Sequence, residues 1–258
     1  MRLRFIFTSL GLLPFLVLAQ EGNRNGLNAA DAHAVSAGTQ LVLHVGGQAP
    51  AGPLADRFGL SNTIGMGVRR TTYSGWRFGA HYRFQTGADV RENGLLQNLV
   101  DPNGRIVDNE GRIALVTAQQ RGTLLFLTAG RKWPTGGQHP ETGFIAEVGA
   151  GFWEHKIHFQ NRGNRVTQLD EPHLAGYDRL TGGGMLLPRV GFEYHSPNGQ
   201  ARLEFGLEAC LGRLQPNRIW NADTGTRDIG PRSDRTVGVF AGWILRLKAR
   251  SSSLDYYY

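Results

Sequence analysis

A strict alternation of residue types runs through the last strand-like segment of the chain, Thr236 to Lys248. Every second residue from Val237 to Leu247 is apolar, and the intervening positions are mostly small or charged. Successive side chains of a β-strand point to opposite faces, so this segment is predicted to be a strand with one apolar face and one mixed face. A chain made of such strands needs a closed sheet or a second sheet to cover its edges and apolar faces.

Seven earlier segments show the same alternation, which is clearest in Gly75 to Gln85. The face that the fourth segment would bury is ambiguous, because Leu124 to Leu127 is apolar throughout. The eight predicted strands cover residues 39–46, 60–70, 75–85, 122–133, 143–159, 186–195, 200–212 and 236–248.

The links between these strands alternate in length. Those after the second, fourth and sixth strands are short, whereas those after the third, fifth and seventh are long and polar, and the first link is intermediate. Outer-membrane barrels combine an even number of strands with short periplasmic turns and longer extracellular loops. The pattern therefore predicts an all-β fold, an eight-stranded antiparallel transmembrane β-barrel over residues 39–249, in preference to a β-sandwich. The longest link is predicted to hold one helical turn at Gly94 to Val100, followed by a small hairpin.

The two ends of the chain carry export and assembly signals. Residues 1–19 have a basic start, an apolar run and a small-residue cleavage site, which predict a secretory signal peptide. Residues 20–38 are predicted to be a flexible lead-in. The tail, residues 250–258, ends in an aromatic triplet that resembles a barrel-assembly signal: Tyr256, Tyr257 and Tyr258. These features predict a protein of a Gram-negative outer membrane with both termini on the periplasmic side.

The charge balance bears on the partners. The formal net charge is +7, and an exported chain rarely meets nucleic acid. Contact with outer-membrane lipids, including lipopolysaccharide, or with other outer-membrane or periplasmic proteins explains the positive charge better. Aromatic residues beside the short turns are expected to form a girdle at the membrane interface: Tyr73, Trp76, Trp133, Phe144 and Tyr194.

The residues predicted to face the barrel interior include charges of both signs. An eight-stranded barrel is only wide enough for side chains to fill it, and buried charges must be paired. We therefore expect a packed polar plug instead of an open channel, formed by Arg69, Arg77, His81, Arg83, Glu147, Arg189, Glu193, Arg202, Glu204, Glu208 and Arg246. The lone Cys210 is expected to be a small inward residue, because it has no partner for an internal disulfide.

No motif for catalysis, a metal or a cofactor stands out in the sequence. His155 and His158 have an odd spacing, which places them on opposite faces of a strand, and we interpret both as rim residues. The segment D-P-N-G-R-I-V-D-N-E-G from Asp101 lacks the spacing of a calcium loop and fits paired β-turns better. No serine stands in a G-x-S-x-G setting. No cofactor is predicted.

Four stretches resemble small outer-membrane β-barrel proteins of the Bacteroidetes: Gly46 to Gly59, Gly75 to Gly87, Gly149 to Ile157 and Gly176 to Gly183. That family is similar in plan to the OmpA and OmpX barrels, and some members are accessory to type IX secretion or barrel-assembly machinery. The resemblance implies a non-enzymatic structural or accessory component of an outer-membrane assembly. The alternative is a lipid-A-modifying barrel enzyme. In the accessory interpretation the first candidate contact is the loop with Tyr177, Asp178 and Arg179, because tyrosine and arginine are common at interface hot spots.

Overall fold

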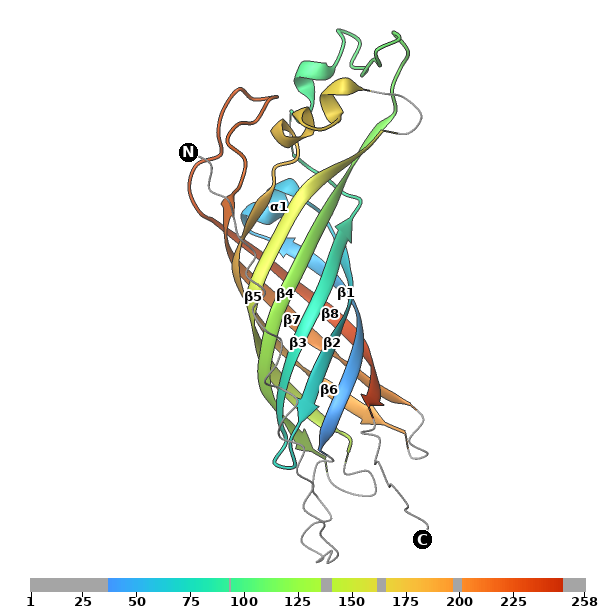
Figure 1. Cartoon of the computed structure of the whole chain (residues 1–258), viewed down its shortest axis with the longest axis vertical. Helices are drawn as coiled ribbons and strands as arrows, with labels where there is room; N and C mark the ends of the chain where they lie inside the picture. The colour runs from blue at the N-terminus through green and yellow to red at the C-terminus, as the bar shows by residue number, and fades with distance from the viewer. Residues whose placement is uncertain (1–36, 93, 136–140, 162–165, 197–200, 248–258) are drawn as a thin grey trace, which may run out of the picture. The chain divides into compact units, whose positions relative to one another are not determined.

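Eight antiparallel strands close into a barrel in which each strand pairs with its neighbour in the chain and β1 pairs with β8 (Figure 1). The computed structural model describes residues 37–92, 94–135, 141–161, 166–196 and 201–247. The predicted eight-stranded antiparallel barrel is confirmed. The strands are β1 (Gly38–Ala51), β2 (Ser61–Thr71), β3 (Trp76–Gly87), β4 (Val116–Pro134), β5 (Gly143–Asn161), β6 (Thr181–His195), β7 (Arg202–Pro216) and β8 (Arg232–Leu247).

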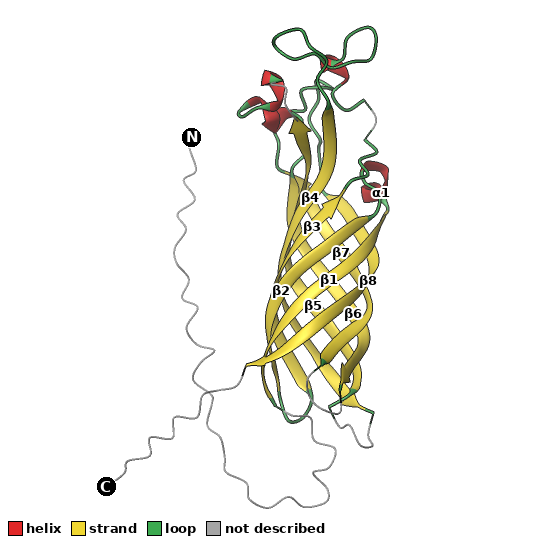
Figure 2. Cartoon of the chain, turned by 90° about the vertical axis from the view of Figure 1, so that its right-hand side faces the viewer, coloured by secondary structure: helices red, strands yellow, loops and turns green. Residues whose placement is uncertain are grey.

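The connections are segregated by length, as predicted. Strands β2, β4 and β6 finish at one end of the barrel, here called the turn end, where the short links begin. Strands β1, β3, β5 and β7 finish at the other end, the loop end, where the longer links begin. The start of β1 and the end of β8 are at the turn end. Figure 2 shows all the helices at the loop end. None of the helices in the described ranges is long and apolar enough to cross a membrane.

The strands extend further toward the loop end than the alternation predicted. β1 continues to Ala51, β4 begins at Val116, and β6 begins at Thr181. In these extensions the outward residues are polar, as at Thr117 and Gln119 of β4, or the strand contains glycine and proline. The apolar alternation therefore stops before the hydrogen-bonded ladder does.

The long link between β3 and β4 differs in detail from its prediction. Its helical turn is present as η2 (Gln97–Leu99). The small hairpin is instead two successive tight turns, one closed between Asp101 and Arg105 and the next between Asp108 and Arg112. In each turn the aspartate carboxylate accepts backbone N–H groups two and four residues ahead. This arrangement explains the near-repeat without a cation. The first long link contains a helix that the sequence did not predict, α1 (Pro53–Arg57).

The two faces of the sheet differ in burial: inward side chains are mostly buried and outward side chains are mostly exposed. The ambiguity in β4 is resolved, since Leu124 and Phe126 are buried inside the barrel while Leu125 and Leu127 are exposed on its outer surface. Large apolar side chains cover the outer surface of every strand, and the predicted girdle residues are exposed near the turn end. Cys210 is buried, as expected. The barrel therefore has an apolar exterior belt and an interior that contains the charged residues.

Candidate functional site

The interior of the barrel toward the turn end is a connected ion-pair network centred on Glu204 of β7. Arg69 Nη1 and Arg77 Nη2 donate to Glu204 Oε2 at 2.6 and 2.9 Å, and Arg189 Nη2 donates to Oε1 at 2.6 Å. All of these groups are buried. One carboxylate thus joins three guanidinium groups from β2, β3 and β6.

Two further glutamates balance the arginines. Glu193 lies 3.1 Å from Arg77 Nη1 and accepts a hydrogen bond from Lys132 Nζ at 2.7 Å. Glu147 forms ion pairs with Arg77 Nε at 2.7 Å and with Arg189 Nε at 3.3 Å. Lys132 was not among the predicted interior residues, because the apolar run in β4 hid which face that strand turns inward.

A second polar layer lies nearer the loop end. Arg83 Nη1 donates to both carboxylate oxygens of Glu208 at 2.9 Å, and Gln48 donates to the same carboxylate. His81 shares a hydrogen bond of 3.1 Å with Thr128 and stacks on Phe126. Across this layer the interior has side chains in contact and charges in pairs, which is the arrangement expected of a plug.

The turn end is held together by Glu141, in the link between β4 and β5. Its carboxylate accepts hydrogen bonds from Arg246 Nη2 of β8 at 2.7 Å and lies 2.8 Å from His195 Nδ1 of β6. Arg202 of β7 is 3.5 Å away. Arg202 and Arg246 are only partly buried, near the ends of their strands, and so lie at the rim of the barrel. The other predicted interior residues are buried inside it.

The loop end is closed by a cap with its own apolar core. Leu54 and Phe58 from the first loop belong to the same apolar cluster as Trp153 and Ile157, in the loop-end half of β5, and Tyr177, just before β6. Trp153 also donates its indole N–H to Gln85 inside the barrel at 3.0 Å. The cap and the barrel interior are thus in direct contact.

Ion pairs join the four loops above this core. Arg179 Nε donates to Glu92 at 2.8 Å, and Arg179 Nη2 lies 2.7 Å from both oxygens of Asp223. Arg57 of α1 bonds to Glu92 and Asp228, and Arg218 bonds to Asp178. Burial alone lowers the pKa of Arg179, but its bonds to Asp223 and Glu92 outweigh that effect and raise the pKa, so this residue stays charged.

The predicted contact loop is buried in this cap. Tyr177, Asp178 and Arg179 are 4%, 1% and 3% exposed. Tyr177 accepts a hydrogen bond from Asn98, and the other two side chains are occupied by the ion pairs of the cap. The expectation that these residues face a partner was wrong, because polar and charged side chains of two other loops, 88–115 and 217–231, bind them within the cap. No local sequence pattern marks their partners, Glu92 and Asp223.

His155 was also misplaced by the sequence. It is fully buried below the cap, with Nε2 2.9 Å from Asp234 Oδ2 and with the rings of Phe58 and Trp153 beside it. His158 is on the opposite face of β5, as its spacing predicted. Within the described residues no group of three or more histidine, cysteine, aspartate or glutamate side chains could hold a metal ion.

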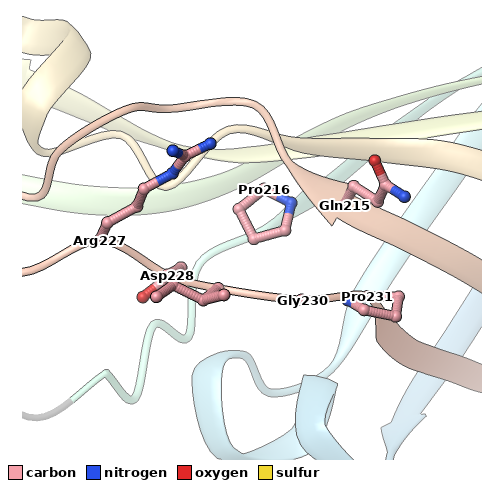
Figure 3. Close-up of a pocket in the computed structure, with 7 residues that line it drawn as sticks. Gln215, Pro216, Arg227, Asp228, Gly230 and Pro231 are labelled. Atoms are coloured by element: carbon pink, nitrogen blue, oxygen red, sulfur yellow. The ribbon is translucent and has the colours of Figure 1, made fainter.

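A pocket of about 350 Å³ opens on the loop between β7 and β8 (Figure 3). Its lining includes Gln215, Pro216 and Arg227 to Pro231. Asp228 bonds to Arg57 and Asn221, so the carboxylate is already engaged within the cap. The same loop carries exposed apolar side chains: Ile219 is 80% and Trp220 54% exposed. This loop therefore offers an exposed apolar surface at the loop end.

The predicted signal peptide, lead-in up to residue 36 and aromatic residues Tyr256, Tyr257 and Tyr258 lie outside the described residues.

No protein-family model matches the sequence, and no curated protein matches it. Among solved structures, the chain is similar to Neisserial surface protein A, with 10% identity, a TM-score of 0.44 and coverage of 81% of this chain and 97% of that one. It is also similar to Ail, the attachment invasion locus protein of Yersinia pestis, with 10% identity, a TM-score of 0.40 and coverage of 82% and 99%. A third is the outer membrane protein OprG from Pseudomonas aeruginosa, with 9% identity, a TM-score of 0.34 and coverage of 84% and 99%.

Proposed function

We propose that this chain is a non-enzymatic barrel of a Gram-negative outer membrane, with the turn end in the periplasm, and that it acts as a structural or accessory component of an outer-membrane assembly. The observation that carries the proposal is that the barrel is filled inside and apolar outside. Apolar side chains on the outer surface, such as Leu125, Phe152 and Val239, are exposed in the isolated chain and match a lipid environment.

Because the interior of the barrel is filled, we expect partners to bind the outside of the protein. The charge network around Glu204, the Arg83–Glu208 layer and the capped loop end occupy the space through which a solute would pass. The described residues also place no serine or cysteine nucleophile against the His155–Asp234 pair. A partner would therefore bind the exposed loops or the outer surface of the strands.

The resemblance to Bacteroidetes barrels suggests a secretion or barrel-assembly complex as the assembly. The exposed Ile219 and Trp220 on the loop between β7 and β8 are the new candidate contact, in place of the buried Tyr177 loop. An exposed tryptophan next to an isoleucine and arginines has the composition of an interface hot spot.

The test is co-purification of the tagged native protein in mild detergent, comparing wild type with the variant Ile219→Ser/Trp220→Ser. We expect the variant to lose its partners and to stay folded, with different gel mobilities before and after boiling, because both side chains are exposed. The matched control is Val107→Ser/Ile113→Ser, two exposed apolar residues of another loop. Unchanged recovery of partners from the first variant would contradict this contact, and identical mobilities of boiled and unboiled wild type would contradict the membrane barrel itself.

A further inference from the structure

Two cations face each other without a counter-ion on the outer surface of the β4–β5 ladder. Arg121 of β4 is directly opposite Lys156 of β5, and both side chains are on the outer face. Directly opposed residues of an antiparallel pair have Cβ atoms about 4.5–5.5 Å apart, and like charges at this position are destabilising. Neither side chain forms an ion pair or a side-chain hydrogen bond in the described part of the chain, although both backbones belong to the strand ladder.

The pair lies just above the apolar belt. Along the outer face, the row Leu125–Phe152 is exposed and apolar, the next row is Thr123–Glu154, and the row after that is Arg121–Lys156. Four residues of strand span about 13 Å, and a tilt of about 40° reduces this rise to roughly 10 Å along the barrel axis. Lipid headgroups extend several ångströms beyond the hydrocarbon core, and long cationic side chains reach toward them.

The neighbouring side chains complete a surface for an anion. His158 is in the next row, opposite Gln119, and it lies close enough to Arg121 and Lys156 to feel both charges. Thr86 of β3 flanks Arg121 on the other side. Glu154 is diagonal to Arg121, but it forms no ion pair in the described structure and lies near Arg218 of the cap. This part of the outer face thus has a guanidinium and an ammonium in directly opposed positions, with His158 and Gln119 in the next row; Gln119 Nε2 donates to Gln160 Oε1 at 3.3 Å.

We propose that Arg121 and Lys156, with His158 and Gln119 beside them, bind a phosphate group of a phosphorylated glycolipid in the outer leaflet. The proposal rests on the outer-membrane placement proposed above. A phosphate between the two cations removes their repulsion, and a guanidinium can hold phosphate oxygens through two parallel hydrogen bonds. The site is on the lipid-facing wall of the barrel, separate from the interior network and from the pocket of the β7–β8 loop.

The test is binding of lipid A to the folded full chain in zwitterionic detergent, followed by native mass spectrometry. The probes are bis-phosphorylated lipid A, the same lipid without phosphates, and inorganic phosphate. We expect Arg121→Gln/Lys156→Gln to weaken binding of the phosphorylated lipid by at least about tenfold, which is the factor for losing a single charge-assisted hydrogen bond, because the variant removes both cations. The control Arg105→Gln/Arg112→Gln removes the same charge from exposed turns and should bind like wild type.

Reversing the charge of Lys156 distinguishes a role in lipid binding from a role in the stability of the barrel. In Lys156→Glu an acid would face Arg121, so the barrel should unfold at a higher temperature in lipid-free micelles while its affinity for phosphorylated lipid A falls. A purely structural role for Lys156 would not move these two readouts in opposite directions. If the double variant fails to fold, Lys156→Gln is measured with the charge reversal in its place.

Three results would overturn the proposal. These are unchanged affinity in the substituted proteins, equal affinity for the lipid without phosphates, or inorganic phosphate binding as tightly as the lipid, which would assign the patch to a free anion. Each of them leaves a heat-modifiable barrel that inserts into membranes, so the outer-membrane function would stand. Loss of insertion in the wild-type chain would instead contradict the proposed function.

Discussion

At the scale of single residues, Glu204 is a buried carboxylate shared by three arginines from three different strands. It accepts hydrogen bonds from Arg69, Arg77 and Arg189, none of which is exposed to water. Removing one member of a buried ion network leaves the remaining charges without compensation, which costs more than the network itself contributes. Loss of one interior charge is therefore expected to destabilise the barrel, although the presence of the ion pairs does not by itself show that they add to the free energy of unfolding.

The first prediction is that Glu204→Gln destabilises the barrel by about 3–5 kcal/mol, the usual effect of breaking a buried pair. The measurement is urea unfolding of the chain in lipid vesicles. Glu110→Gln is the matched control, because its ion pair with Arg112 is exposed and such pairs contribute roughly 0–1 kcal/mol. Equal midpoints for the two variants would show that the interior is solvated and that water replaces the lost partner.

At the scale of elements, the cap depends on Arg179, which connects three loops. Its backbone has a φ of 50°, in the left-handed region that residues other than glycine seldom adopt. The ion pairs with Glu92 and Asp223 hold the side chain in place. The tertiary contacts of this residue thus stabilise a backbone conformation that its local sequence disfavours.

Arg179→Gln is expected to loosen the loops and leave the strands intact. Loss of a hydrogen bond to a charged group costs about 1.5–3 kcal/mol, which corresponds to roughly tenfold to hundredfold faster cleavage of the loops by protease. Limited proteolysis followed by mass spectrometry measures this rate. The control is Arg105→Gln, on an exposed turn of the same end. Protease resistance equal to wild type would mean that the apolar core around Leu54 and Tyr177 holds the cap without the ion pairs.

For the whole molecule, the consequence of the two interior layers and the cap is a closed barrel. The chain in planar bilayers should show no large, stable conductance, because an eight-stranded barrel has room only for its own side chains. A steady pore that passes small sugars would contradict this and would mean that Arg77, Glu204 and their neighbours line water. Heat-modifiable mobility of the same sample is the control that the barrel was folded.

The sequence determined the strands, their number, their antiparallel order and, in most of them, the inward face. Alternation with a period of two is a local property of a strand, so it can be read without knowing its neighbours. Prediction from this alternation failed where the alternation is absent. It did not show that Lys132 faces inward, because the nearby run in β4 is apolar throughout, and it missed the strand extensions whose outer faces are polar.

Only the tertiary structure decided which charges meet. Arg77 and Glu204 are 127 residues apart, and their contact depends on the closure and register of the barrel. The same holds for Arg179 with Glu92, 87 residues apart, and for the burial of Tyr177 that follows from the packing of the cap. The opposition of Arg121 and Lys156 likewise comes from the register of β4 on β5. Register places side chains across space, and no single strand contains that information.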